Sequence, residues 1–415
     1  MAASATAETC DVVVIGGGPA GAAASTLLQQ QGHSCLVLEG ATFPRYHIGE
    51  SLIPHTFGTL ERLGLLPRMR ASNFPEKHSV RFVSPYGKES EPFYFLETVE
   101  GEASRTWQVE RSAFDQICLD NARDNGVEVR METVVDEVLF EADCCVGVRA
   151  KQRDGAACEI RSKVVIDASG ARTVIGSQLG LKTAVPGLEK ASLWSYYRGG
   201  KRLEGLDAGE TTILMLHDGG WFWYIPLPDD IVSVGIVGAP DLLFPDSEDQ
   251  EAVFEQQVQG CTPLMDRLSA ATRTEPVRGI PRLAYRNRQT AGDGWVMVGD
   301  AAAFLDPIYS SGLFLALGSA ELAADCIHEA LSEEDLSAAR LGAFAAPLGR
   351  GVEVIRRLIH AFYDPAFRFR DFVQRYPEHR GALIDCLVGN VIDRDMHGFL
   401  DALAQMTPPP APLDG

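Results

Sequence analysis

The stretch DVVVIGGGPAGAAASTLLQQQGHSCLVLE, Asp11 to Glu39, decides the fold of this chain. Its first apolar run, Val12 to Ile15, is too short for a helix and rich in β-branched residues, so it predicts a buried parallel strand. A helix is expected from about Ala20 to Gln31, where Gly32 ends it. A second buried strand is expected from Cys35 to Leu38. This order of elements is typical of an α/β sheet that binds a dinucleotide.

Three glycines between the first strand and the helix satisfy the pattern G-x-G-x-x-G. The first allows a tight turn, the second lets a pyrophosphate approach the backbone, and the third lets helix and strand pack closely. The acid that ends the second strand has the spacing of one that binds a ribose 2′-hydroxyl. The predicted dinucleotide site includes Gly16, Gly18, Ala20, Gly21 and Glu39.

The composition of the 415-residue chain limits its partners. The length favours two joined domains. A net charge of −20 argues against nucleic acid or an anionic membrane as a partner. The start of the chain lacks a signal-peptide pattern, no apolar run reaches transmembrane length, and the nine cysteines are scattered, so a cytoplasmic protein is expected. The nine histidines show no metal-binding spacing, and we predict no metal.

The rest of the chain alternates between two kinds of pattern. Strand–helix patterns predict a discontinuous Rossmann-like α/β domain, and short strand-like runs between Pro and Gly turns predict an inserted antiparallel β-sheet domain for the substrate. One helix is expected over Leu52 to Leu66, closed by Pro67. The nucleotide-binding domain is assigned to residues 8–72, 104–186 and 287–345, the sheet domain to 73–103 and 187–286, a C-terminal helical region to 346–407, and a disordered tail to 408–415.

Further candidate residues lie outside the fingerprint. Arg45 and Ser51 belong to a polar loop after the second strand, which either crosses the surface or holds phosphate. Three distant segments join the fingerprint as parts of one site: Arg111 with Asp115, Asp167 to Gly170, and Gly299 with Asp300.

A nucleotide domain that is interrupted by sheet insertions and closed by a late V-G-D-A-A sequence resembles the FAD-binding fold of aromatic hydroxylases and their relatives. The resemblance implies FAD as the cofactor, with Asp300 accepting a hydrogen bond from a ribitol hydroxyl. It also places the amides around Pro307 to Gly312 at a helix N-terminus that faces the flavin ring, where the helix dipole stabilises negative charge.

Two further segments resemble the flavin-dependent halogenases. Trp221, Trp223, Ile225 and Pro226 form a W-x-W-x-I-P sequence, which on its own also fits a β-strand with aromatic residues on one face. Phe304 to Gly312 matches F-x-x-P-x-x-S-x-G. The resemblance implies that the tryptophan segment lies by the flavin and keeps the substrate away from it. It also implies that the amides of Ser311 and Gly312 hold a halide ion.

Lys77 is the third feature of this resemblance. It lies in a segment similar to the halogenase pattern F-x-x-K-x-G-x-x-F, with Ser79 in place of the glycine. A lone lysine is usually a solvated surface residue, but this one is flanked by apolar positions at a domain junction, where pockets form. The resemblance implies that reduced FAD, oxygen and halide give hypohalous acid, which Lys77 orients or carries as a haloamine.

The substrate class follows from one departure. Tryptophan halogenases carry a glutamate immediately before the serine of the last pattern, where this chain has Tyr309. A small electron-rich aromatic substrate such as a phenol or pyrrole is therefore expected, either free or tethered to a carrier protein. The resemblance also implies a separate flavin reductase that supplies the reduced FAD.

Three alternatives stay open at this point. A flavin monooxygenase could hydroxylate an aromatic ring on the same fold. A prenyl-chain (geranylgeranyl) reductase shares the Gly-Glu-Ser loop at Gly49 to Ser51, but it would not need Lys77. A flavin-binding protein without catalytic activity is the third. The tryptophan segment, the lysine and the Ser-Ser-Gly turn favour the halogenase.

Overall fold

The fingerprint strand is at the centre of a mixed sheet in the computed structural model, which describes residues 8–246 and 249–413. Strand β1 (Glu8–Ile15) pairs in parallel with β2 (Cys35–Leu38) and β10 (Ala157–Asp167). Its last four residues are fully buried, as expected for a strand covered on both faces. The sheet also contains β7 (Glu128–Arg130), β8 (Thr133–Glu141), β9 (Cys144–Gln152), β19 (Ala291–Gly292) and β20 (Trp295–Met297).

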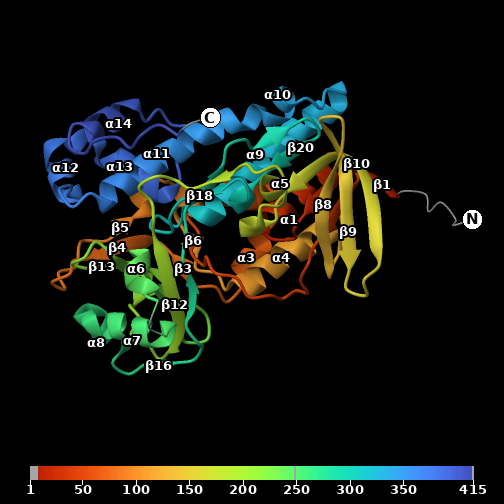
Figure 1. Cartoon of the computed structure of the whole chain (residues 1–415). Coiled ribbons are helices and arrows are strands. Elements are labelled where there is room, and N and C mark those ends of the chain that lie inside the picture. The colour runs from red at the N-terminus through yellow and green to blue at the C-terminus, as the bar shows by residue number, and fades with distance from the viewer. Residues whose placement is uncertain (1–7, 247–248, 414–415) are drawn as a thin grey trace, which may run out of the picture.

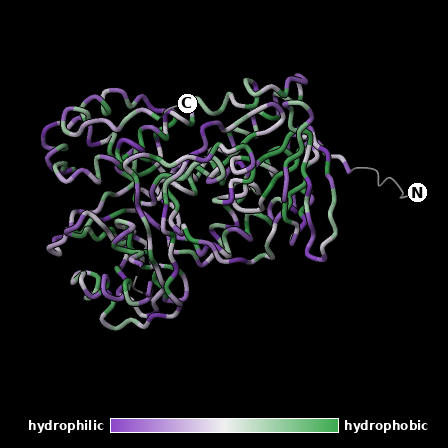
Figure 2. Tube along the Cα trace, viewed as in Figure 1, coloured by the Kyte–Doolittle hydropathy of each residue, from purple (hydrophilic) through white to green (hydrophobic). Residues whose placement is uncertain are grey.

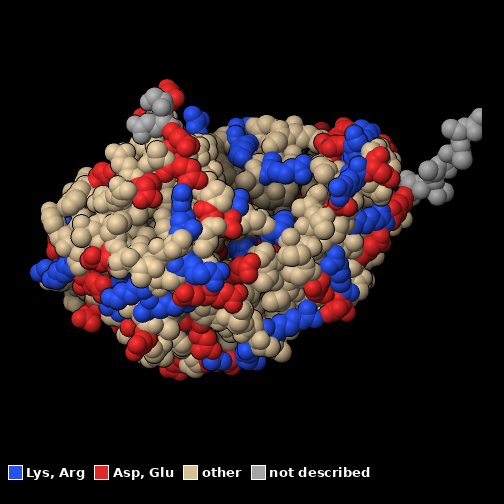
Figure 3. Space-filling view, turned by 90° about the horizontal axis from the view of Figure 1, so that it is seen from below, with Lys and Arg blue, Asp and Glu red and all other residues tan. Residues whose placement is uncertain are grey.

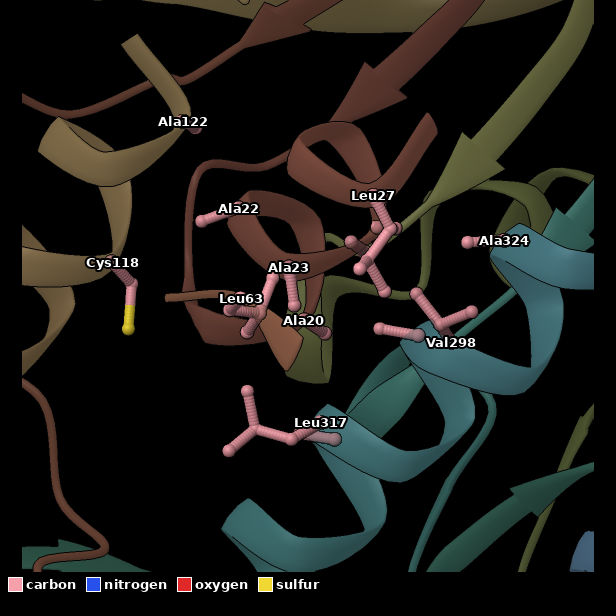
Figure 4. Close-up of a cluster of buried hydrophobic side chains, with 14 of the residues drawn as sticks. Ala20, Ala22, Ala23, Leu27, Leu63, Cys118, Ala122, Val298, Leu317 and Ala324 are labelled. Atoms are coloured by element: carbon pink, nitrogen blue, oxygen red, sulfur yellow. The ribbon is translucent and has the colours of Figure 1, made fainter. Parts of the chain in front are cut away.

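Three helices pack together on one face of this sheet. Helix α1 (Pro19–Gln30) follows the glycine turn and lies between α4 (Arg111–Asp124) and α9 (Ser311–Glu333). Figure 4 shows the small side chains of α1, such as Ala20 and Ala23, in this contact, where they let the neighbouring helices approach closely. The prediction of a strand, a glycine turn and a helix over the first stretch is confirmed.

A second sheet forms the lower left part of the molecule in Figure 1. Most of its neighbouring strands are antiparallel, but β4 pairs with β13 in parallel, so one pair departs from the predicted antiparallel pattern. The two strands belong to segments far apart in the sequence, residues 79–83 and 211–215, and they run in the same direction. Its strands are β4 (Ser79–Val83), β5 (Phe93–Tyr94), β12 (Ala191–Arg198), β13 (Thr211–Met215), β14 (Trp221–Pro226), β15 (Ile231–Gly238), β16 (Thr272–Arg273) and β17 (Arg278–Ile280).

Helices from the end of the chain cover the second sheet near its contact with α9. They share one apolar cluster with the inner face of that sheet, and Figure 2 shows how apolar residues concentrate along such interior segments. The helices are α11 (Ala345–Tyr363), α12 (Phe369–Arg375), α13 (Arg380–Val388) and α14 (His397–Ala404). The short helix α10 (Ala338–Leu341) instead packs against α9 and the strands β19 and β20 of the first sheet. Among the described residues, no helix is long and apolar enough to cross a membrane.

The helix expected over residues 52–66 and its closure by Pro67 need correction. The single helix expected over residues 52–66 is two short helices, α2 (Thr56–Arg62) and α3 (Leu66–Ala71), because Gly64 at φ +72° interrupts it. Pro67 does not close a helix but lies in the first turn of α3, where its missing N–H is not needed. In the predicted tail, residues 408–413 are described, and the Ala411 carbonyl accepts a hydrogen bond from Arg356; residues 414–415 of this tail lie outside the described residues.

Candidate active site

A cavity of about 1190 Å³ lies between the carboxyl end of the first sheet and the inner face of the second. On the face of the molecule shown in Figure 3, basic and acidic side chains are intermingled, so charge of one sign does not dominate it. Most residues predicted from the sequence line the cavity: Gly16, Gly18, Ala20, Glu39, Arg45, Ser51, Arg111, Trp221, Trp223, Ile225, Asp300, Pro307 and Gly312. Gly21, Lys77, Pro226 and Ser311 lie behind its wall.

The glycine turn of the fingerprint is sterically constrained. Gly16 has φ +101°, which L-residues with a side chain rarely adopt. A Cβ atom on Gly21 would lie 2.0 Å from the carbonyl oxygen of Gly16. Gly18 begins α1 without a side-chain cap, so the first amides of this helix have no intrahelical acceptor. Such a helix N-terminus fits a pyrophosphate.

Two carboxylates at the cavity fit the sugar parts of FAD. Glu39 accepts hydrogen bonds from the backbone amides of Gly17 (2.7 Å) and Ala41 (2.8 Å), which fix its direction. The Asp300 carboxylate has no hydrogen-bond donor among the described residues, and burial raises its pKa to about 6 against the opposing charge of Arg111. An unpaired carboxylate at a cavity wall needs a donor such as a ribitol hydroxyl.

Arg111 binds the polar loop that follows the second strand, at Ile48 and Gly49. Its guanidinium forms a bidentate pair with Asp115 at 2.7 and 3.0 Å and donates to the carbonyl of Ile48 at 2.6 Å. Arg45, in contrast, reaches the phosphate-binding turn, because a Cβ on Gly18 would lie 3.2 Å from its guanidinium. Of the two loop residues with an open role, Arg45 therefore lies where a phosphate would bind.

The tryptophan segment alternates across β14. Trp221, Trp223 and Ile225 face the cavity, while the residues between them belong to the core behind the sheet. The Trp223 indole donates to Ser233 at 3.0 Å. On β15, Gly235 leaves room for this indole, since a Cβ there would lie 2.1 Å from the Trp223 ring.

Trp221 is held by the C-terminal helical region. Its indole donates to the hydroxyl of Tyr363 at 2.9 Å, and this hydroxyl donates to Asp306 at 2.8 Å. Burial raises the pKa of Asp306 to about 6. Tyr363 could not be predicted from the sequence, because it lies 142 residues after its partner and no local pattern singles it out.

The N-terminus of α9 offers an anion site. Ser310 has φ +54° and does not cap the helix with its side chain, and a turn from Pro307 to Ser310 leads into it. The amides of Ser311 and Gly312 have no intrahelical acceptor. Gly312 lines the cavity, so a halide there would meet free amides and the positive end of the helix dipole.

Lys77 does not line the cavity itself but lies behind Ser51, which does. It belongs to β3 (Glu76–Lys77) and is fully buried, and its Nζ donates to Ser51 Oγ at 2.8 Å and to the Leu52 carbonyl at 3.1 Å. Because Ser51 lines the cavity, its hydroxyl connects the buried amine with the cavity wall. Burial lowers the pKa of Lys77 to about 7, and no carboxylate in the described chain forms an ion pair with it. Two acceptors match the two N–H groups of a neutral amine.

The lowered pKa makes the stability of the protein depend on pH. Between about pH 7 and the ordinary lysine value of 10.5, the unfolded chain holds a proton on Lys77 that the native chain lacks, so native stability rises with pH. Lys77→Met removes this rise. The stability of this variant relative to the wild type is expected to fall by on the order of 4 kcal/mol across that window.

Denaturant unfolding at both ends of the pH window measures this change. Lys88→Met, at an exposed lysine, is the matched control and should show no such trend. A Lys77→Met difference that stays constant with pH would mean that the amine is charged in the native protein.

The comparison with known proteins decides the family. A model described as tryptophan halogenase matches residues 11–98 and 87–371. The chain belongs to the flavin-dependent halogenases. The halogenase is 30% identical over 417 residues to the 1H-pyrrole-2-carbonyl-(peptidyl-carrier protein) chlorinase of Pseudomonas fluorescens, and the match covers 95% of this chain and 92% of the relative.

Other relatives agree. The halogenase is 33% identical to the corresponding brominase of Pseudoalteromonas luteoviolacea, over 78% of this chain and 79% of the relative. The solved structure of a flavin-dependent brominase matches with a TM-score of 0.86 at 29% identity, covering 96% of this chain and 98% of that one. The halogenase is therefore an FAD-dependent oxidoreductase with halide as a substrate, and the hydroxylase and reductase alternatives are not favoured.

Proposed function

We propose that the halogenase makes hypohalous acid in the cavity and delivers it to an aromatic substrate through Lys77. The observation that carries this proposal is a buried amine of lowered pKa, which lies 2.8 Å from a cavity-lining serine and forms no ion pair with a carboxylate of the described residues. FAD, when bound and reduced, supplies the electrons with which oxygen oxidises the halide. Gly16, Gly18, Glu39, Arg45 and Asp300 would hold it.

Each part of the protein then has one task. The amides of Ser311 and Gly312 bind the halide anion, and the wall of Trp221 and Trp223 keeps an aromatic ring out of the cavity. Lys77 either orients the hypohalous acid as a hydrogen-bond donor or reacts with it. In the second case the amine nitrogen takes the halogen and water leaves. The halogen then passes to a ring carbon, the ring loses a proton, and the amine is restored.

For the substrate, we propose an electron-rich pyrrole tethered to a carrier protein. Two relatives at 30% and 33% identity are named for a pyrrole-2-carbonyl group on a peptidyl carrier protein. Tyr309 supports a ring that needs no carboxylate base, because it replaces the glutamate of tryptophan halogenases and its hydroxyl donates to the Leu358 carbonyl at 3.3 Å.

The supply of reduced FAD is proposed to come from a separate flavin reductase in the cytoplasm. The chain has one dinucleotide fingerprint, which the proposed FAD site already uses. All nine cysteines are free thiols, which supports a reducing compartment.

Product masses test this proposal. The enzyme is supplied with a flavin reductase, NADH, FAD, oxygen and either chloride or bromide, and offered pyrrole-2-carbonyl on a carrier protein, free pyrrole-2-carboxylate or a free phenol. We expect replacement of hydrogen by halogen on the carrier-bound pyrrole, at a rate at least about tenfold above the free rings, because the carrier adds binding energy. Addition of one oxygen would overturn the halogenase function. Equal or faster reaction of a free ring would overturn the carrier-bound substrate.

A further inference from the structure

The halogenase reaction needs a proton inside the protein. Over one turnover, reduced FAD, oxygen, a halide ion and one proton give oxidised FAD, hypohalous acid and water. Each anion that enters the cavity must therefore be matched by a proton. This requirement rests on the proposed function, and an acid at the cavity wall that exchanges protons would meet it.

One buried acid stands at the end of a hydrogen-bonded chain. Glu50 lines the cavity and is 3% exposed. Its carboxylate accepts a hydrogen bond from the Tyr196 hydroxyl at 2.7 Å, and this hydroxyl lies 3.0 Å from that of Tyr46. The indole of Trp194 donates to the Tyr46 hydroxyl at 2.5 Å. Tyr46 is 44% exposed and also lines the cavity, so the chain joins the buried acid to a side chain that water reaches.

The two ends of this chain fix the direction of every hydrogen bond in it. An indole only donates and a carboxylate only accepts, so Tyr46 donates to Tyr196 and Tyr196 donates to Glu50. A proton that reaches the Tyr46 oxygen from water therefore displaces one proton toward Tyr196, which displaces another onto Glu50. We propose that Tyr46, Tyr196 and Glu50 form the proton relay that delivers one proton to the cavity with each halide ion.

Two properties of Glu50 suit this role. Burial raises its pKa to about 7, so it exchanges protons near neutral pH. Hydrogen bonds from Tyr196 and Ser233 and the charge of Arg111 oppose this shift, whereas the charge of Glu110 adds to it. At the outer end, the Arg278 guanidinium stacks on the Tyr46 ring at 4.0 Å and keeps the ring in place.

The first test needs no cofactor. Infrared titration of the apoprotein follows the carbonyl band of protonated Glu50, identified by its loss in Glu50→Gln. We expect a midpoint near pH 7 in the wild type. Tyr196→Phe removes a hydrogen bond to the carboxylate and should raise the midpoint by about one unit. Tyr197→Phe is the matched control, because Tyr197 is the next residue on β12 and its hydroxyl is buried without a partner among the described residues.

The second test measures halide-dependent turnover against pH. Tyr196→Phe and Tyr46→Phe should lower turnover at least about tenfold, more severely as the pH rises above 7 and protons become scarce, while Tyr197→Phe stays within about twofold of the wild type. Tyr46 is half-exposed, so its variant remains informative if Tyr196→Phe fails to fold. Retained FAD binding verifies an intact cavity.

The relay is overturned if Tyr196→Phe and Tyr46→Phe keep wild-type turnover, or if turnover falls equally at all pH values with an unchanged Glu50 midpoint. Absence of halogenated product from the wild type would instead reject the proposed function. The apoprotein titration would still show whether Tyr196 controls the pKa of Glu50.

Discussion

Lys77→Met is expected to lower halogenation at least about a thousandfold, because it removes the only nitrogen proposed to carry or orient the electrophilic halogen. Binding of FAD and oxidation of reduced FAD should stay near wild-type levels, since the lysine lies behind Ser51 and does not line the cavity. Product mass, FAD fluorescence and oxygen consumption measure the three quantities. The exposed Lys88→Met variant should match the wild type in all of them.

A second substitution at the same site separates the two roles left open for the lysine. Lys77→Arg keeps a hydrogen-bond donor but cannot become a neutral nucleophile. An inactive arginine variant that folds and binds FAD supports the haloamine, and substantial residual activity supports orientation by hydrogen bonding. Halogenation by Lys77→Met at a rate close to the wild type would remove the lysine from the mechanism altogether.

Gly21→Ala is expected to have the second large effect. Its methyl group would lie 2.0 Å from the Gly16 carbonyl oxygen, so α1 must move away from the turn that would hold the pyrophosphate. We expect FAD affinity to fall at least about a hundredfold, together with a loss of roughly 1–3 kcal/mol in stability from overpacking. Equilibrium dialysis against FAD and denaturant unfolding of the apoprotein measure the two effects.

Gly58→Ala provides the control for this substitution. Gly58 also lies near the start of a helix, α2, but a Cβ there meets no other described part of the protein within 4 Å. Alanine should therefore leave FAD affinity unchanged and stabilise the helix by up to about 1 kcal/mol. If both variants bind FAD equally well, the close contact between Gly21 and Gly16 does not shape the cofactor site.

Features encoded in short stretches could be predicted from the sequence. The fingerprint strand, turn and helix follow from β-branched residues and three glycines, and β14 follows from alternating aromatic residues. Lys77 could be singled out by its neighbours in the chain, but its burial, its two acceptors and its lowered pKa are visible only in the folded protein.

Features that depend on distant contacts could not be predicted. Glu50 meets Tyr196 across 146 residues, and the parallel pairing of β4 with β13 joins two separate excursions. The loop sequence also allows Ser51 to bind phosphate, because it does not show that the hydroxyl of Ser51 accepts from Lys77. The sequence signal for Glu50 is its place in the Gly-Glu-Ser loop, between Gly49 and Ser51.

The contact between Tyr363 and Trp221 has a consequence for protein engineering. The last turn of α11 supplies the hydroxyl that accepts from Trp221 and donates to Asp306, so the end of the chain helps to build the wall beside the cofactor. A chimera that takes its C-terminal third from a relative would inherit a different partner for this indole. Segment exchange aimed at new substrates should therefore take α11 and β14 from the same parent protein.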